Sequence, residues 1–332
     1  MNEWLDSRSG LGLYQYWELY FRYPIDLSLI HQIDLAVGRK VRRFGFPIER
    51  LYWLLKLRRI LAHPVSYMRR LSYARRVLRK ASRRGVIPKH IGYAPISPNA
   101  FPNVDALVEI CARIFAQRQG VDATNAPKPF YANLLDEQDL ISNPEILEFA
   151  LNDQLLEIVT DYLGTLPRLS AVGLQYSPVN MTIKSSQMFH VDGDDFHQVK
   201  CFINIMDVGP EDGPLSFLPA DTSKCVRANL EHGWRAGRLT DAQVFGECSR
   251  DDLIMVTGAA GSGILLDTSS CLHFGSRVRG RPRLVLMCQY TPCPNLETDL
   301  WRFEQNGSVS IRFPLNKYED QPVKRAVLSE LV

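Results

Sequence analysis

The second half of the chain consists of short apolar runs separated by turn-forming residues. After Leu166 the runs LSAVGLQY, VKCFINIMDV, GILLD and RLVLMCQY are bounded by clusters of Gly, Pro, Asp and Ser. Runs of this length are typical of β-strands, because a helix needs about ten or more residues. Several short strands at close spacing indicate a sandwich or a barrel. We therefore expect a β-rich fold with flanking helices (α+β).

Helical patterns precede these strands. A helix is expected over 104–119, another begins at Asn143-Pro144-Glu145, and a third spans 151–164 and stops at Gly164. The expected organisation is a basic helical N-terminal region (1–90), a connector with one helix (91–129), a β-rich core (130–296) and a C-terminal extension packed on the core (297–332). The glycine-rich segment 253–263 resembles a dinucleotide-binding turn, but the run after it indicates a strand where that fold needs a helix.

Positive charge is concentrated between Arg39 and Lys89. This segment holds 17 Lys/Arg and one acid, so it carries +16, and because the whole chain carries +3 the remainder carries −13. Helices are expected over 48–62 and 65–85, the second ending at Gly85. At 100° per residue the second helix has one apolar and one cationic side. The apolar side holds Tyr67, Leu71, Ala74, Val77, Leu78 and Ala81, and the cationic side holds Arg69, Arg76, Arg79, Lys80, Arg83 and Arg84.

Two interpretations of this basic segment remain open. The helices can pack on the main body with solvated arginines, or they can contact an anionic membrane surface or a phosphorylated substrate. No nucleic-acid motif is present, so a nucleic-acid partner is not expected. The chain has no apolar run of membrane-spanning length and no signal-peptide pattern at its start. We expect a cytoplasmic protein, with a peripheral position on the inner face of a membrane as the alternative. The oligomeric state is left open.

The segment QMFHVDGDDFH (187–197) concentrates two histidines and three aspartates. If MFHVD is a strand, its period of two places His190 and Asp192 on one face. A metal ion needs a third ligand, for which His197, His232 and His273 are candidates. His273 follows a predicted strand and a short loop, and Arg283 comes ten residues later at the start of another strand.

This spacing matches the two-histidine, one-carboxylate triad of non-haem Fe(II) oxygenases. In the 2-oxoglutarate enzymes an arginine binds the far carboxylate of the co-substrate through two parallel hydrogen bonds. Arg283 is preferred for this role because it opens an apolar strand. The competing arginines are Arg277, Arg279 and Arg281. Lys200 and Gln187 have two possible roles: they can contact the co-substrate or the substrate, or they can occupy exposed strand positions.

From Phe130 to Cys293 the chain resembles the phytanoyl-CoA dioxygenase-like family of Fe(II)/2-oxoglutarate oxygenases. The resemblance rests on YLG, on FHVDGDDFHQVKCFINIMDVGPEDGPLSFLPA and on LLDTSSCLHFGSRVRGRPRLVL. It implies a double-stranded β-helix (jelly-roll, cupin-like) core. It also implies iron ligation by His190, Asp192 and His273, and co-substrate binding by Arg283 assisted by Ser276.

The expected function is an Fe(II)- and 2-oxoglutarate-dependent dioxygenase that uses O2. Hydroxylation of a small-molecule, acyl or lipid-linked (glycolipid) substrate is the default outcome, with release of succinate and CO2. One alternative is a metal-binding jelly roll without oxygenase activity, either an isomerase or a carbohydrate- or lipid-binding module. Another is an interaction protein whose pocket is inactive and whose basic helices make the contacts.

Overall fold

The computed structural model describes residues 53, 56–57, 60–79, 81–118, 129–233, 237–294 and 313–329. The chain divides into two units, Met1–Pro64 with Leu296–Ser308 and Val65–Asn295 with Val309–Val332. The second unit holds both β-sheets and all of the predicted site residues.

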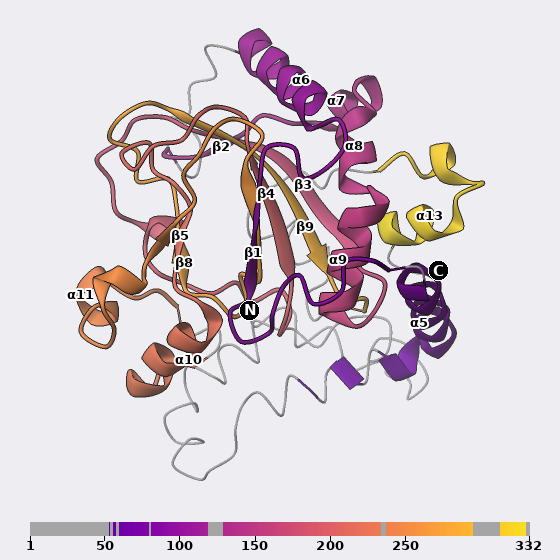
Figure 1. The fold of residues 1–332 in the computed structure, drawn as a ribbon, viewed down its shortest axis with the longest axis horizontal. Helices are drawn as coiled ribbons and strands as arrows, with labels where there is room; N and C mark the ends of the chain where they lie inside the picture. Colours follow the sequence, from indigo (N-terminus) through magenta and orange to yellow (C-terminus); the bar gives the residue numbers. More distant parts are fainter. Residues whose placement is uncertain are drawn as a thin grey trace, which may run out of the picture. The chain divides into compact units, whose positions relative to one another are not determined.

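A six-stranded antiparallel sheet forms the centre of this unit (Figure 1). Its strand order is β1-β7-β4-β9-β3-β2, and the longest ladder pairs β3 with β9 from Arg168↔Thr291 to Ser177↔Arg283. Its strands are β1 (Tyr93–Ile96), β2 (Ala132–Asn133), β3 (Arg168–Ser177), β4 (Val199–Asn204), β7 (Gly263–Leu266) and β9 (Arg283–Thr291).

A smaller antiparallel sheet has the order β6-β5-β8, with β5 (Ser216–Phe217), β6 (Ile254–Met255) and β8 (His273–Phe274). After β4 the chain enters the small sheet for β5 and β6 and returns to the large sheet for β7. It then enters the small sheet again for β8 and returns to the large sheet for β9. Every strand pairing in the described part of the chain is antiparallel. The predicted α+β class with a β-rich core is therefore confirmed.

Alternate residues of the central strands face two different apolar clusters. In β7, Leu265 packs in the larger cluster with the helices, whereas Ile264 and Leu266 pack with Phe217 of the small sheet. This follows from the two-residue period of a strand. Because β9 is covered on both faces, all nine of its residues are buried, which explains its nearly continuous apolar sequence.

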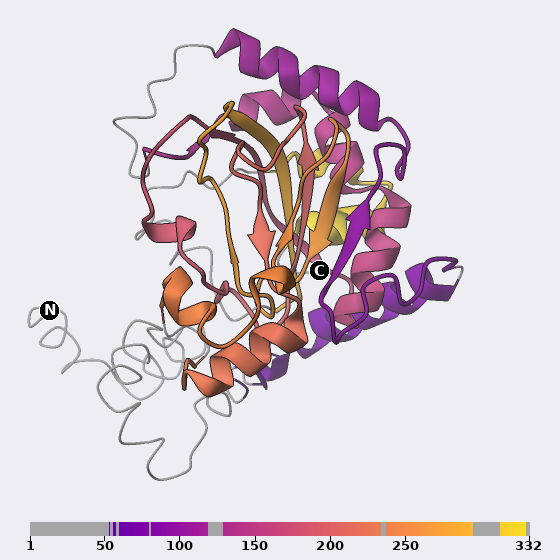
Figure 2. The same cartoon turned by 60° about the vertical axis from the view of Figure 1, so that its left-hand side comes forward.

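Helices cover the face of the six-stranded sheet that lies away from the small sheet, as Figures 1 and 2 show for α8, α9 and α13. The helices of this layer are α6 (Val104–Gln117), α7 (Glu137–Ser142), α8 (Glu145–Ala150), α9 (Asp153–Leu163) and α13 (Pro322–Leu328). The remaining short helices are α10 (Ala220–Asn229), α11 (Asp241–Val244), η2 (Ser185–Gln187), η3 (Arg250–Asp252) and η4 (Leu315–Tyr318).

Most predicted element positions are confirmed. Helix α9 ends at a left-handed Gly164 (φ 71°), which is the conformation that a glycine C-cap provides. The helix expected over 104–119 is α6, and the helix start at Pro144 is that of α8. The glycine-rich segment 253–263 contains β6, a turn and the first residue of β7.

Helix α5 (Pro64–Arg79) is shorter than the helix predicted over 65–85, which is a correction. The backbone N–H of Arg83 donates to Glu157 Oε1, and that of Gly85 donates to Asp161 Oδ2 at 2.8 Å. Because carboxylates of α9 bind these two donors, the donors do not continue the i−4 ladder of α5. The helix predicted over 48–62 lies mostly outside the described residues.

One arginine of α5 is buried. Arg70 is 0% exposed, and its guanidinium donates to the carbonyl oxygens of Leu166 (3.4 Å), Pro167 (3.2 Å) and Ala326 (2.8 Å), and to that of Ser329. It therefore connects α5 to the start of β3 and to α13. Arg69, Arg75, Arg76 and Arg79 are exposed. Within the described residues, no helix has both the length and the apolar character that crossing a membrane requires.

Candidate metal centre

His190 and His273 meet through their backbones. Each donates its N–H to the carbonyl oxygen of the other, at 3.0 and 2.9 Å, so they form an isolated antiparallel bridge. Phe189 makes a second bridge with Leu239, but the predicted strand over MFHVD does not form. The bridge brings His190 beside the distant His273, and Asp192 lies near both rings.

The three predicted metal ligands lie together. His190 Nε2 is 3.8 Å from Asp192 Oδ1, and His273 Nε2 is 3.8 Å from Asp192 Oδ2. The two imidazole centroids are 4.3 Å apart, and one ligand atom from each residue lies within 4.8 Å of the others. Cis ligands about 2.1 Å from an ion lie about 3 Å apart, so a modest contraction would bring these three ligand atoms to binding distance of one ion. The donor set of two imidazoles and one carboxylate fits ferrous iron.

Backbone carbonyls orient both imidazoles. The Nδ1 atom of His190 lies 2.9 Å from the carbonyl oxygen of Met188, and that of His273 lies 3.0 Å from the carbonyl oxygen of Cys271. A carbonyl only accepts, so Nδ1 carries the proton in both rings. The Nε2 lone pairs are thereby directed towards the shared space, which is how metal-binding histidines are commonly held.

The two oxygens of Asp192 have different partners. Oδ2 accepts hydrogen bonds from Lys200 Nζ at 2.7 Å and from Gln198 Nε2 at 3.2 Å. Oδ1 faces His190, whose Nε2 lies 3.8 Å away. Lys200, a predicted co-substrate contact, thus binds the carboxylate of the triad. Asp192 would thus hold a metal ion with a carboxylate that Lys200 and Gln198 already orient.

The ionisation states suit a cation. Burial and the neighbouring His273 lower the pKa of His190 to about 3, and burial also lowers the pKa of His273. Burial by itself would raise the pKa of Asp192, but the ammonium group of Lys200 lowers it well below its ordinary value. Neutral imidazoles and an ionised carboxylate are the forms that bind a metal ion.

Arg283 lies at the start of β9 and is 6% exposed. Its Nη2 donates to Ser276 Oγ at 3.2 Å, while Nε has no hydrogen-bond partner among the described residues. Burial lowers the pKa of Arg283 to about 10, and burial raises the pKa of the nearby Tyr131 to about 12. A buried guanidinium with an unsatisfied N–H is an expected feature of a carboxylate-binding site.

Ser276 is held in an unusual conformation. Its φ is +63°, a left-handed value that is uncommon for a residue other than glycine. Its carbonyl oxygen accepts from Asn180 Nδ2 at 3.0 Å and from Gln187 Nε2 at 2.8 Å, and its hydroxyl is 2.9 Å from Ser177 Oγ. Gln187, a predicted co-substrate contact, is fully buried in this network. Gln187 thus binds the backbone of Ser276, whereas Arg283 binds the side-chain hydroxyl of Ser276.

The other three arginines of this region have different surroundings. Arg277 forms a two-bonded pair with Asp241 at 2.7 Å for both contacts, and its Nε donates to the carbonyl oxygen of Gln187. Arg281 binds Asp212, and both Arg281 and Arg279 are exposed. Arg283 is the buried member of the group.

Several residues near the triad were not predicted from the sequence. Gln198 contacts Asp192, and Gln289 donates to Gln198 Oε1 at 2.8 Å. The sequence supplied a signal for Gln198, which directly precedes β4 and lies two residues before Lys200, the spacing that places extended residues on one side. Asp267 and Tyr162, which form a second polar cluster, carried no local signal. The alternative ligand His197 belongs to that cluster, with Nδ1 2.9 Å from Asp267 Oδ2.

No protein-family model matches the chain, and no curated protein matches it either. Membership of the phytanoyl-CoA dioxygenase-like family therefore stays a prediction. Solved structures that resemble the chain include EctD from S. alaskensis in its apo form (17% identity, TM-score 0.45, 64% of this chain and 76% of that chain). A second is SnoK, described as a non-haem α-ketoglutarate-dependent carbocyclase from nogalamycin biosynthesis (15% identity, TM-score 0.45, 66% of this chain and 87% of that chain). A third is HygX from Streptomyces hygroscopicus with nickel and 2-oxoglutarate bound (17% identity, TM-score 0.42, 61% of this chain and 83% of that chain). These likenesses are distant and assign no activity to this chain.

Proposed function

We propose that the protein is a non-haem Fe(II)- and 2-oxoglutarate-dependent oxygenase. The observation that carries the proposal is the convergence of His190, Asp192 and His273, with both Nδ1 atoms bound to carbonyl oxygens and one carboxylate oxygen directed at the shared space. Three protein ligands leave coordination positions for a co-substrate and for dioxygen. A bound ferrous ion with these two partners would supply the oxidation of a substrate C–H bond, with release of succinate and CO2.

The buried Arg283 supports 2-oxoglutarate as the co-substrate. Its guanidinium contacts Ser276, which is only three residues after the metal ligand His273. A guanidinium pairs with a carboxylate through two parallel hydrogen bonds, and burial strengthens such a pair. Arg283 and Ser276 are therefore proposed to hold the carboxylate of 2-oxoglutarate that is distant from the metal. The alternation of the chain between two antiparallel sheets supports a jelly-roll (double-stranded β-helix) core.

Two finer proposals concern the reaction and the alternatives. Hydroxylation is proposed as the default outcome, and the aspartate of the triad argues against halogenation because a halogenase of this type lacks that carboxylate. The other class to be tested is a metal-binding jelly roll without oxygenase activity, acting as an isomerase or as a carbohydrate- or lipid-binding module. That class has no use for a buried, partly unsatisfied Arg283.

Anaerobic titration tests the proposal. Addition of Fe(II) and 2-oxoglutarate together should give a visible charge-transfer band that neither gives alone, at one equivalent of each per chain. The double variant Asp192→Ala, His273→Ala should show no band. Asp212→Asn is a matched control, because it removes a carboxylate that binds Arg281 elsewhere. A normal band in the double variant would contradict the assignment, and metal binding without O2-dependent succinate formation would favour the non-redox class.

We also propose that α5 contacts an anionic membrane surface, so that the site acts on an acyl or lipid-linked substrate. The helix packs on the core through Ala74, with Tyr73 and Val77 beside it. Its outer side exposes Val65 (67%) and Met68 (58%), as well as four arginines. Apolar side chains beside arginines suit the interface of an anionic bilayer.

Vesicle co-sedimentation tests this second proposal. The whole protein should bind phosphatidylserine-containing vesicles at low salt and release in part at high salt, because charge screening weakens the contact. Changing Arg69, Arg75, Arg76 and Arg79 to Gln should weaken binding about tenfold. The control variant changes Lys224, Arg250, Arg279 and Lys317, which are exposed and lie outside α5, to Gln and should bind normally. Equal binding by both variants, or no binding at low salt, would end the membrane proposal and favour a soluble small-molecule substrate.

A further inference from the structure

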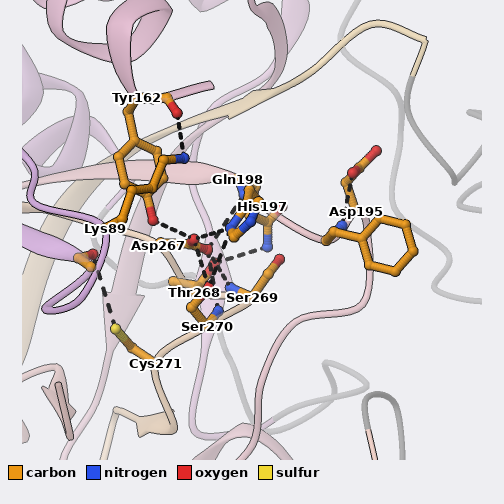
Figure 3. Close-up of polar contacts among 12 residues, drawn as sticks. Lys89, Tyr162, Asp195, His197, Gln198, Asp267, Thr268, Ser269, Ser270 and Cys271 are labelled. Carbon is orange, nitrogen blue, oxygen red and sulfur yellow. Dashed lines mark hydrogen bonds and ion pairs between the residues drawn. The ribbon is translucent and has the colours of Figure 1, made fainter. Parts of the chain in front are cut away.

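A second polar cluster surrounds the carboxylate of Asp267, directly after β7 (Figure 3). Asp267 is 0% exposed. Its Oδ2 accepts from Tyr162 Oη at 2.6 Å, Ser270 Oγ at 2.8 Å and His197 Nδ1 at 2.9 Å. Its Oδ1 accepts the backbone N–H groups of Ser269 (3.0 Å), Ser270 (3.2 Å) and Gln198 (3.4 Å). We call these residues the Asp267 cluster.

The donors come from three separate parts of the chain. Tyr162 lies on α9, His197 and Gln198 precede β4, and the serines follow β7. Burial and the neighbouring Asp267 raise the pKa of Tyr162 far above its ordinary value, so its hydroxyl remains a donor. A carboxylate that accepts six donors fixes the relative positions of the segments that supply them.

The turn that follows Asp267 supports the proposed metal ligands. The carbonyl oxygen of Thr268 accepts the backbone N–H of Asp192 at 2.8 Å. The carbonyl oxygen of Cys271 faces Nδ1 of His273 at 3.0 Å. The side chain of Gln198 donates both to Thr268 Oγ1 at 2.8 Å and to Asp192 Oδ2 at 3.2 Å. Thr268 and Cys271 belong to the turn that Asp267 holds, and Gln198 donates its backbone N–H to Asp267, so all three contacts involve residues positioned by Asp267.

The cluster is not a nucleophilic triad, although it contains Ser270, His197 and Asp267. In such a triad the serine faces the ring nitrogen that does not bind the aspartate. Here Ser270 Oγ lies 3.4 Å from Nδ1 of His197, which is the nitrogen bound to Asp267. That nitrogen carries the proton donated to the carboxylate, so it does not accept the proton of Ser270.

We infer that Asp267, with Tyr162 and His197, is a positioning centre for the metal site. The three residues act on the metal through the Thr268 and Cys271 carbonyls and through Gln198, without touching it. This inference rests on the proposed metal-dependent function. Partners of this kind around a metal site change its affinity by about 10- to 100-fold when they are removed.

Cobalt(II) binding to the whole protein tests the inference, because Co(II) reports ligand geometry through its visible spectrum. Tyr162→Phe and His197→Leu should each lower Co(II) affinity about tenfold and change the spectrum. His197→Asn should restore both, because the Asn amide places an N–H donor where Nδ1–H lies in His. Tyr290→Phe is the matched control: it removes a buried hydroxyl bound to the carbonyl oxygen of Ala150, and should bind Co(II) normally.

The outcomes separate this inference from the proposed function. If the unmodified protein does not bind Co(II), the metal-dependent function itself fails. If the unmodified protein binds Co(II), and Tyr162→Phe and His197→Leu bind it with the affinity and spectrum of the unmodified protein, the positioning role is wrong. If His197→Asn is as impaired as His197→Leu, the imidazole acts by another route and the inference is also wrong. Ser270→Ala removes only one of the six donors, so it gives a milder test if a larger change prevents folding.

Discussion

Asp192 and Asp267 lie in neighbouring segments joined by a backbone hydrogen bond, yet their carboxylates differ in one respect. Asp267 is completely enclosed, and both of its oxygens accept hydrogen bonds from within the protein. The Asp192 side chain is 19% exposed, with Oδ2 bound to Lys200 and Gln198 and with Oδ1 facing His190. The difference indicates that one carboxylate organises the chain and that the other retains an oxygen for a ligand.

Arg277 and Arg283 show the same difference for guanidinium groups. All three nitrogens of Arg277 donate to protein acceptors, and its guanidinium lies 3.6 Å from the ring centroid of Phe274. Arg283 is more deeply buried, but its Nε has no hydrogen-bond partner among the described residues. Burial of an unsatisfied donor is costly, so this Nε supports the proposal that Arg283 binds a ligand. Under the proposed function, the saturated member of each pair has a structural role and the open member binds the metal or the co-substrate.

The largest expected effect tests the first pair. Asp192→Asn should lower Fe(II) affinity about 1000-fold, roughly 4 kcal/mol, because the amide replaces a charged ligand. The same change should alter the free energy of unfolding of the metal-free protein by less than about 1 kcal/mol, since the side chain is partly solvated. Anaerobic metal titration and urea unfolding give the two numbers. If the free energy of unfolding fell by more than the free energy of Fe(II) binding, Asp192 would have a structural role and would not be a metal ligand.

The complementary change should have the opposite profile. Asp267→Asn leaves Tyr162, His197 and Ser270 facing an amide, so the free energy of unfolding should fall by about 3 kcal/mol in urea. Its Fe(II) affinity should fall only about tenfold, in line with a positioning role. Asp212→Asn, which removes a carboxylate bound by Gly209 and Arg281, should cost about 1 kcal/mol. If Asp267→Asn and Asp212→Asn lowered the free energy of unfolding equally, the number of donors to a carboxylate would not determine how much it stabilises the fold.

The sequence predicted the parts of this arrangement that have a local pattern. The strands were visible because alternating and continuous apolar runs have a fixed period. The triad was visible because two of its ligands are two residues apart and because a histidine and an arginine follow at a recognisable spacing. Even there the expected strand over MFHVD is replaced by two single bridges, so the side chains were predicted better than the backbone that carries them.

The buried groups with a structural role could not be predicted, because their partners lie far away along the chain. Asp267 is joined to Tyr162 and His197, which precede it by 105 and 70 residues. Its local sequence, LLDTSS, indicates no more than a turn. Arg70 lies within a run of arginines, and only the carbonyl groups just before β3 and in α13 distinguish it from its exposed neighbours. Such residues become identifiable only when the tertiary structure shows which acceptors surround each charge.

The smallest expected effect concerns the two arginines. Arg283→Lys replaces a planar fork with a point charge, which loses one charged hydrogen bond to the co-substrate, about 1.5–3 kcal/mol. The dissociation constant for 2-oxoglutarate should therefore rise about 10- to 100-fold, measured by the anaerobic charge-transfer band, with metal affinity unchanged. Arg277→Lys loses the fork to Asp241 instead, so it should lower the unfolding free energy by about 1 kcal/mol and leave the dissociation constant nearly unchanged. Arg281→Lys, at an exposed position, should change neither quantity by a measurable amount. A larger rise in the dissociation constant for Arg277→Lys than for Arg283→Lys would mean that Asp241 releases its arginine to the co-substrate, and that the unsatisfied Nε of Arg283 does not mark the binding group.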